Sequence, residues 1–385
     1  MPIYKMDGKK DGLQRYRVRI NYTDSSGKNK QIDRVAYGKE EAKELERKLC
    51  LKLKEETTAK ITLDELADEY IKAKKNEVRE TTTAKNKELL NRYVLPTLGK
   101  AKVNKLTIKQ MQDWKLYMEE QKNSSGENLS LKYKQNVYGT FSALLNYAVK
   151  MEYIANNPLS KLGNFKDANL IKSEMDFYTA TEFNKFIKAA YENAEVYEKT
   201  TGSIYEWNFY VFFMIAFYTG MRKGEINALK WSDIKNDTIY VIRSIAQKLK
   251  GGDRETPPKN KSSIRTIQIP IPLKSALAEH YKRYSNLSGF TDDFRICGGE
   301  KCIRDTTLDL RNREFSDKAG LKKIRIHDYR HSHASVLINA GINIKEIARR
   351  LGHSKVEQTW NTYLHLYPQE EQRALDVLNN LDKNV

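Results

Sequence analysis

The segment that most strongly constrains the fold reads HDYRHSHASVLINAGINIKEIARRLGHSKVEQTWNTYLH and covers residues 327–365. His327 and Arg330 are three residues apart, so they share one face of a predicted helix. The pair combines an imidazole that titrates near neutral pH with a guanidinium that can hold two phosphate oxygens. His353 begins a new turn, and Tyr363 lies on the next predicted helical segment. The segment therefore predicts helices that carry a proton carrier, an anion clamp and a phenol.

The predicted helix before His353 has end signals of its own. Asn343 and Glu346 form a capping pattern at its start. Gly352 suits its C-terminal end, because glycine readily adopts the left-handed backbone conformation found there.

Other interpretations of this segment remain open. His327 and His331 are four residues apart and could bind a metal ion, but the glutamate of a zinc-protease helix is missing between them. A tyrosine among helical apolar residues, such as Tyr363, is commonly part of a core. Tyr367 is a second tyrosine nearby.

A second arginine lies upstream in the segment TGMRKGE, residues 219–225, after a strongly apolar run. Gly220 and Gly224 bracket Arg222 and permit close approach of the backbone. An arginine fixed at a helix boundary can hold two phosphate oxygens through its fork. The alternative is a surface arginine that pairs with Glu225, three residues further on.

A lysine-containing segment, PPKNK, ends the predicted loop Gly251–Lys261. This loop lies between predicted strands at Thr238–Ser244 and Ile264–Ile269, to which we expect the β content of this region to be confined. Lys259 on such a hairpin could swing over a bound phosphate and donate a proton, and Lys261 is the alternative. A solvated loop lysine is the simpler interpretation of either residue.

Polar segments divide the chain into three predicted domains. The first covers residues 1–55, and a linker is expected at residues 55–60. An all-helical domain at residues 62–158 follows, and residues 159–175 are expected to be a second linker before the largest domain at 176–385. Helical spacing within the middle domain recurs near residues 82–94, 107–120 and 130–150.

The N-terminal domain is predicted to be a small β-sheet followed by a helix at residues 40–53. The run Leu13–Tyr22 alternates apolar side chains with Arg15, Arg17 and Arg19, so the arginines share one face. Such a row of guanidinium groups on a β-ribbon could enter a DNA groove; the alternative is a solvated strand face. Further strands are predicted at residues 3–6 and 30–36, with a turn at residues 24–27.

Composition narrows the possible partners. The net charge is +18, from 68 Lys and Arg against 50 Asp and Glu, which favours a polyanion. No apolar run reaches the length of a membrane span and the first residues lack a signal-peptide core, so we expect no membrane partner. The three cysteines do not indicate a disulfide framework, and Cys297 with Cys302 would be only half of a metal site.

The order Arg, Lys, His-x-x-Arg, Gly-His, Tyr from Arg222 to Tyr363 resembles the tyrosine recombinase family. It is most similar to the integrases of conjugative transposons and temperate phages of Gram-positive bacteria. The resemblance implies a multidomain, mainly α-helical fold. That fold has an N-terminal three-stranded β-sheet plus helix that binds arm-type DNA, and a helical core-binding (SAM-like) domain. It ends in a mostly helical catalytic domain with a small β-sheet.

The resemblance also implies residue roles. The phosphate-activating set would be Arg222, Lys259, His327, Arg330 and His353. Tyr363 would be the nucleophile that forms a 3′-phosphotyrosine bond, with His327 accepting its proton and Lys259 protonating the departing 5′ oxygen. No cofactor or metal would be needed.

The family's mode of action implies partners as well. These are double-stranded DNA with core-type and arm-type sites, a homotetramer on paired sites, and an accessory protein that sets direction, in the bacterial cytoplasm. Apolar residues after Tyr363 suit docking on a neighbouring subunit or on their own domain: Leu375, Val377, Leu378 and Leu381.

Two competing functions are considered. A type IB topoisomerase would share the chemistry without exchanging DNA partners, but the basic sheet and the separate helical domain favour site-specific recombination. A non-catalytic DNA-binding regulator could use residues 331–350 as a helix-turn-helix, but it would not need the ordered set of cations and the tyrosine.

Overall fold

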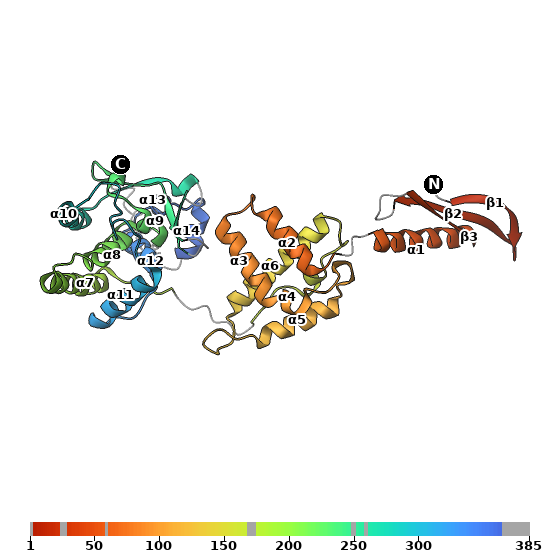
Figure 1. The fold of residues 1–385 in the computed structure, drawn as a ribbon, viewed down its shortest axis with the longest axis horizontal. Helices are drawn as coiled ribbons and strands as arrows, with labels where there is room; N and C mark the ends of the chain where they lie inside the picture. Colours follow the sequence, from red (N-terminus) through yellow and green to blue (C-terminus); the bar gives the residue numbers. More distant parts are fainter. Residues whose placement is uncertain are drawn as a thin grey trace, which may run out of the picture. The chain divides into compact units, whose positions relative to one another are not determined.

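The computed structural model divides into two compact units, Met1–Ile171 and Lys172–Val385. Figure 1 traces the helices and strands of both units along the chain. The predicted turn at residues 24–27 and the apolar tail after Tyr363 lie outside the described residues. The structure describes residues 3–23, 29–57, 61–167, 175–247, 252–257 and 261–363.

An antiparallel sheet with strand order β1-β2-β3 opens the first unit, as the alternating sequence predicts. Its central strand pairs Val18 with Arg34, and Arg17 with Val35. Val18 is fully buried against Ala42 of the following helix, so the apolar face of the sheet is covered. The elements are β1 (Ile3–Lys10), β2 (Leu13–Thr23), β3 (Asn29–Tyr37) and α1 (Lys39–Thr57). Because α1 continues to Thr57, the linker predicted from residue 55 begins inside a helix.

A bundle of helices forms the rest of the first unit. Thr62 begins the first of them with a capping box, in which its side chain accepts from the Glu65 backbone N–H and Glu65 returns a bond. Thr107 and Gln110 repeat this arrangement at α5. The helices are α2 (Leu63–Lys74), α3 (Glu80–Tyr93), α4 (Leu95–Leu98), α5 (Ile108–Glu120) and α6 (Leu131–Lys150), with short 3₁₀ turns η1 (Val103–Lys105) and η2 (Pro158–Leu162).

The segment after α6 differs from the predicted polar linker at residues 159–175. Leu159 is fully buried and Phe165 is 3% exposed, and both belong to the core of the bundle. The Phe165 ring lies 6.2 Å from Trp114, and Gln135 donates to the Phe165 carbonyl at 3.0 Å. Two apolar side chains among polar neighbours therefore tie this segment to the helices.

Phe165→Ala is expected to lower the unfolding free energy of the bundle by about 3 kcal/mol, because it empties a buried aromatic site. Hydrogen exchange of the α5 and α6 amides, followed by mass spectrometry, measures this locally in the full chain. The control is Leu116→Ala, since Leu116 is 59% exposed. Equal, small effects of the two changes would contradict the packing role.

The second unit is built around the apolar helix α8, which packs against α7, α10 and α12 (Figure 1). Phe209, Phe212 and Phe213 of α8 are fully buried, which explains why this run is apolar on every side. The helices are α7 (Ala180–Thr201), α8 (Trp207–Thr219), α9 (Lys223–Ala228), α10 (Ile271–Ser285), α11 (Asp305–Lys318), α12 (Asp328–Asn339), α13 (Ile344–Leu351) and α14 (Val356–Tyr363).

Two small antiparallel sheets accompany these helices among the described residues, with strand orders β4-β5-β8 and β6-β7. The prediction confined the strands to Thr238–Ser244 and Ile264–Ile269. It missed β4, which pairs with β5 through Ile234 and Ile239, and β7, which pairs with β6 through Ile245 and Glu255. The strands are β4 (Ile234–Lys235), β5 (Thr238–Val241), β6 (Ser244–Ala246), β7 (Arg254–Thr256) and β8 (Arg265–Gln268), with 3₁₀ turns η3 (Trp231–Asp233) and η4 (Lys261–Ser263).

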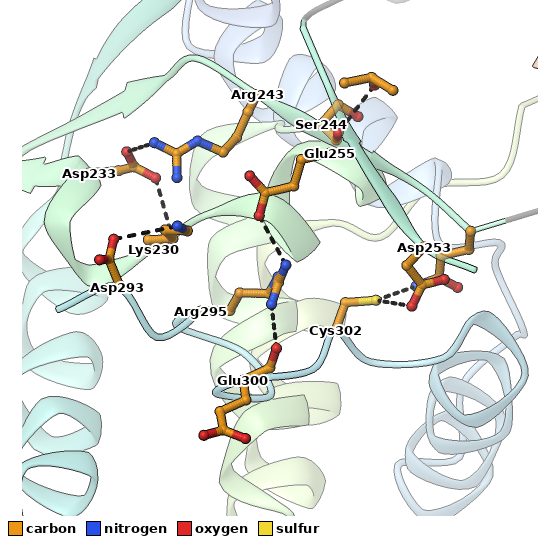
Figure 2. Close-up of polar contacts among 12 residues, drawn as sticks. Lys230, Asp233, Arg243, Ser244, Asp253, Glu255, Asp293, Arg295, Glu300 and Cys302 are labelled. Atoms are coloured by element: carbon orange, nitrogen blue, oxygen red, sulfur yellow. Dashed lines mark hydrogen bonds and ion pairs between the residues drawn. The ribbon is translucent and has the colours of Figure 1, made fainter. Parts of the chain in front are cut away.

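Side chains far away in sequence hold the β6–β7 hairpin. Arg295 donates to the Glu255 carboxylate at 2.9 Å, and the Cys302 thiol donates to Asp253 at 3.0 Å. Figure 2 shows these contacts between the hairpin and the loop that carries Arg295 and Cys302. Strand β7 was missed because the side chains that hold it are distant in sequence. Its own residues, Arg-Glu-Thr, show no apolar alternation.

The predicted fold class is confirmed: a three-stranded sheet with a helix, a helical bundle, and a mostly helical second unit with small sheets. Across the described ranges, no helix is both long enough and apolar enough to span a bilayer.

Candidate active site

Arg222 occupies the turn between α8 and α9. Helix α8 ends at Gly220, whose φ of +64° is left-handed, and a Cβ there would lie 2.8 Å from the His333 ring. Arg222 is the N-cap residue of α9, and its Nη1 donates to Glu225 at 2.9 Å. Arg222 is therefore held at a helix boundary and also pairs with Glu225, whereas its contact with phosphate stays a prediction.

Arg330 lies on α12 and is 2% exposed. Its Nη1 donates to the Gly220 carbonyl at 2.8 Å, which joins it to the turn that carries Arg222. Its Nη2 is buried and has no hydrogen-bond partner among the described residues. Burial, followed by repulsion from Arg222 and Arg265, lowers the pKa of Arg330 to about 9. A buried cation with an unused donor, crowded by other cations, favours an anion at this place.

Glu225 is the buried acid of this cluster, at 3% exposure. Burial opposes its ionisation, but Arg265 and Arg222 hold the pKa of the Glu225 carboxyl below its usual range. Arg265 donates to it through Nη2 at 2.9 Å. Arg222 and Arg265 thus share one carboxylate, which acts on Arg330 only through space, and these three described arginines outnumber the acid.

His353 follows the left-handed Gly352 that ends α13, as the sequence predicts. Its Nδ1 lies 2.7 Å from the Thr359 hydroxyl, which fixes the ring. Burial, followed by repulsion from Arg330 and Arg222, lowers the pKa of His353 to about 3. The imidazole is therefore neutral at physiological pH and lies in the field of the arginines.

His327 is the residue that precedes α12, and it is exposed. Partial desolvation, followed by repulsion from Arg330, lowers the pKa of His327. Its ring packs edge-on against His331, with 5.2 Å between the centroids. A neutral, accessible imidazole next to the arginine cluster can accept a proton.

Tyr363 ends α14 and is 1% exposed. Its hydroxyl lies 2.7 Å from Nδ1 of His331, and its ring packs with Ile338 and Leu351. Burial raises the pKa of the Tyr363 phenol to about 12, although the nearby Arg330 acts in the opposite direction. The phenol is thus close to the cation cluster and is held neutral.

His331 is a partner of Tyr363 that the sequence interpretation missed. Burial, followed by the neighbouring His327, lowers the pKa of His331 to about 4, so it is a neutral hydrogen-bond partner. Its spacing from His327 indicated only a possible metal pair. Among the described residues no cluster of His, Cys, Asp or Glu is suited to a metal, and Cys302 instead contacts Asp253.

The structure does not place the other predicted site residues in this cluster. Lys259 is outside the described residues; Lys261 begins the turn η4, but its side chain is not described. In the N-terminal sheet, Arg19 pairs with Asp33 at 2.9 Å. Arg15 and Arg17 are half-buried on the same face of β2.

The site brings together two guanidinium groups for an anion, neutral imidazoles and a phenol, on a mostly helical fold. This chain belongs to the phage integrase family, whose model matches residues 177–370. A second model, the phage integrase N-terminal SAM-like domain, matches residues 62–119. The protein is therefore a tyrosine recombinase, an enzyme of site-specific DNA recombination.

Relatives agree with this assignment over most of the chain. The ICEBs1 integrase of Bacillus subtilis (strain 168) is 27% identical over 391 residues, covering 99% of this chain and 100% of that protein. A tyrosine recombinase XerC-like protein of Caldanaerobacter subterraneus subsp. tengcongensis is 30% identical over 277 residues, or 66% of each chain. Neither the topoisomerase nor the regulator interpretation is supported by these relatives.

Solved structures share the fold. The Tn1549 transposon integrase in complex with circular intermediate DNA has a TM-score of 0.61 at 19% identity, covering 82% of this chain and 98% of that one. A lambda integrase tetramer bound to a Holliday junction has a TM-score of 0.52 at 17% identity, covering 92% and 96%.

Proposed function

We propose that this protein cuts and rejoins DNA at specific sites through a covalent bond between Tyr363 and a backbone phosphate. One observation carries the residue assignment. The buried guanidinium of Arg330 bonds the Gly220 carbonyl in the turn of Arg222, has no partner for Nη2 among the described residues, and interacts electrostatically with Tyr363. A buried cation with an unused described donor therefore lies near a phenol, which supports the assignment of an anion clamp and a nucleophile.

The two arginines would bind the non-bridging oxygens of the scissile phosphate. Charge on these oxygens grows as phosphorus becomes five-coordinate, so fixed cations stabilise the transition state more than the ground state. His353 would donate a further hydrogen bond. Because its pKa is low, it would act as a neutral donor.

The chemical step would exchange one ester for another. A bond forms between the Tyr363 oxygen and phosphorus, the bond from phosphorus to the 5′ oxygen breaks, and a 3′-phosphotyrosine results. The phenol proton would pass to His327, and Lys259, or Lys261 in its place, would protonate the 5′ oxygen. The 5′ hydroxyl of a second strand reverses the step, so no cofactor or metal takes part in the proposal.

The phenol must leave its buried place for this step. Tyr363 is 1% exposed and bonded to His331, so α14 would shift when DNA is bound. The arrangement is consistent with a resting state in which the nucleophile is neutral and shielded from unwanted reactions.

DNA binding and assembly are proposed from the similar proteins. The Tn1549 integrase structure contains DNA, and lambda integrase forms a tetramer on a Holliday junction. We infer that this protein binds double-stranded DNA, through core-type sites at residues 62–158 and arm-type sites at residues 1–55, and acts as a homotetramer on paired sites. Residues 176–385 would be the catalytic domain. An accessory protein would set the direction of recombination. Recombination would take place at the nucleoid in the bacterial cytoplasm.

Replacing both Arg15 and Arg17 with Ala should weaken binding to arm-type duplexes by about tenfold or more and lower the salt dependence of binding by about two phosphate contacts. Core-site cleavage should stay near wild type, because those side chains belong to the N-terminal sheet. Fluorescence anisotropy at several salt concentrations measures this on duplexes selected by the protein from a random-sequence library. The charge-matched control replaces Lys30 and Arg34, which pair with Tyr22 and Val18 on the other face. An equal loss of activity on arm-type and core-type sites would contradict the proposal that residues 1–55 bind arm-type sites alone.

Trapping the covalent complex tests the proposed function. A nicked suicide duplex carrying the selected core half-site releases a short fragment after cleavage, so rejoining fails and the adduct accumulates. Mass spectrometry then gives the modified residue, and sequencing of the released strand gives the cut position. An adduct on another residue, or none on a duplex that binds tightly, would refute the proposal.

A further inference from the structure

Arg265 is a buried arginine outside the predicted catalytic set, at the start of β8. Its side chain is 4% exposed, and all three nitrogens of its guanidinium donate hydrogen bonds. Two of the acceptors, on Glu225 and Arg350, are 40 and 85 residues away in sequence, and the third, on Ser263, is two residues away. One buried planar group therefore joins its own segment to two segments that are distant in sequence.

The first partner leads to Arg222. Nη2 of Arg265 donates to Oε2 of Glu225 at 2.9 Å, and Oε1 of the same carboxylate accepts from Arg222 at 2.9 Å. Oε2 also accepts from the Arg222 backbone N–H at 3.0 Å. The position of Arg222 at the start of α9 thus depends on a carboxylate that Arg265 anchors.

The other two partners are backbone carbonyls. Nη1 donates to the Ser263 carbonyl at 3.1 Å, at the end of the turn η4 that Lys261 begins. Nε donates to the Arg350 carbonyl at 2.7 Å, in the last turn of α13, just before Gly352 and His353. These contacts fix one end of the lysine-bearing segment and the turn that carries the imidazole.

The fit around the guanidinium is tight. A Cβ at Gly352 would lie 3.1 Å from both Cδ and Nη1 of Arg265 and 3.2 Å from the Ser262 carbonyl. The space around the guanidinium is too small for a water molecule to take the place of a lost N–H donor. A lysine has a single nitrogen, which cannot reach three separated acceptors. Loss of the fork would therefore loosen at least two of the three connections.

We propose that Arg265 is a positioning residue that holds Arg222, the η4 end of the lysine segment and the His353 turn in their relative places around the phosphate. The inference rests on the proposed function, because it gives those segments a shared substrate. Arg265 itself would make no bond to DNA, since its side chain is 4% exposed and each of its three guanidinium nitrogens already donates to a protein acceptor.

Arg265→Lys tests this in the full chain. The rate of adduct formation on saturating suicide duplex should fall about 100-fold, because small displacements of catalytic groups are costly. The dissociation constant for the same duplex should stay within about twofold of wild type, since the groups that bind DNA are retained. Arg311→Lys is the matched control. Arg311 holds the buried Glu206 at 2.6 Å, at the opposite end of α8 from Gly220. It should lower the melting temperature without changing the rate.

The outcomes separate the possibilities. A rate for Arg265→Lys within about threefold of wild type, or a loss equal to that of Arg311→Lys, would overturn the positioning role. The Tyr363→Phe variant in the same assay tests the proposed function separately, because a residual adduct there would refute the nucleophile and leave the question of Arg265 distinct.

A second pair of variants serves if Arg265→Lys does not fold. Gly352→Ala pushes a methyl group against Arg265, whereas Gly320→Ala imposes similar backbone strain, at a φ of +64°, with nothing within 4 Å. We expect a large loss of adduct rate for the first and none for the second. Equal rates would contradict the proposal.

Discussion

Tyr363→Phe is expected to abolish covalent attachment to DNA, lowering adduct formation by more than about 1,000-fold, because the nucleophilic oxygen is removed. The fold should survive. The ring keeps its packing against Ile338 and Leu351, and the described contact that is lost is the hydrogen bond to His331. That loss costs about 1 kcal/mol of unfolding free energy, and DNA affinity should not change. Gel separation of protein–DNA adducts on the suicide duplex measures the effect.

Two controls make this result specific. Tyr329→Phe removes another buried hydroxyl, which donates to Asn312 at 2.7 Å, and should leave the adduct intact. Tyr367→Phe tests the second tyrosine near the motif and should also behave as wild type. An adduct that persists in Tyr363→Phe and disappears in Tyr367→Phe would move the nucleophile by four residues.

Arg330→Lys is expected to lower the adduct rate by about 100- to 1,000-fold at saturating DNA, because one preorganised donor to the transition state is lost. The arginine uses Nη1 on the Gly220 carbonyl and leaves Nη2 free among the described residues. A lysine has three donors on a single nitrogen, so it cannot reproduce the spacing with which the two arginine nitrogens would reach the carbonyl and the phosphate. Single-turnover kinetics with a parallel measurement of DNA affinity separates chemistry from binding.

The rates of Arg330→Lys and wild type can be compared only if the variant is still folded under the assay conditions. The introduced lysine would keep a buried positive charge near Glu225, so we expect a modest fall in melting temperature, checked by assaying well below it. Arg311→Lys again controls for loss of a buried fork. A rate unchanged in Arg330→Lys would show that the buried guanidinium serves the fold and not the phosphate.

The local sequence was sufficient to place several helix ends in both units. Thr62 with Glu65 and Thr107 with Gln110 mark helix starts that the structure reproduces. Gly352 marks the end of α13. Caps and periodicity act within one or two turns of backbone, so they can be read from neighbouring residues. At the other end of α13, Asn343 caps the start, but Glu346 pairs with Arg349 instead of closing the box.

The hydrogen bonds and packing contacts that connect these elements could not be predicted from the sequence. Nothing near Arg265 indicates that its partners are Glu225 and Arg350, and nothing near Tyr363 singles out His331 from the other histidines. In the same way, nothing in the polar segment around Phe165 predicts that its ring packs against Trp114.

By itself, the sequence determined many of the helices, the strands of the N-terminal sheet, the family pattern and the candidate residues, because each depends on short-range periodicity or on motif order. Only the tertiary structure decided that Arg330 is buried at the turn of Arg222 and that the Tyr363 phenol is buried against the His331 imidazole. It also decided that the buried Glu225 carboxylate joins Arg222 to Arg265. These features arise from burial and from pairing across long stretches of chain, where desolvation changes both the pKa and the partner of a charged group.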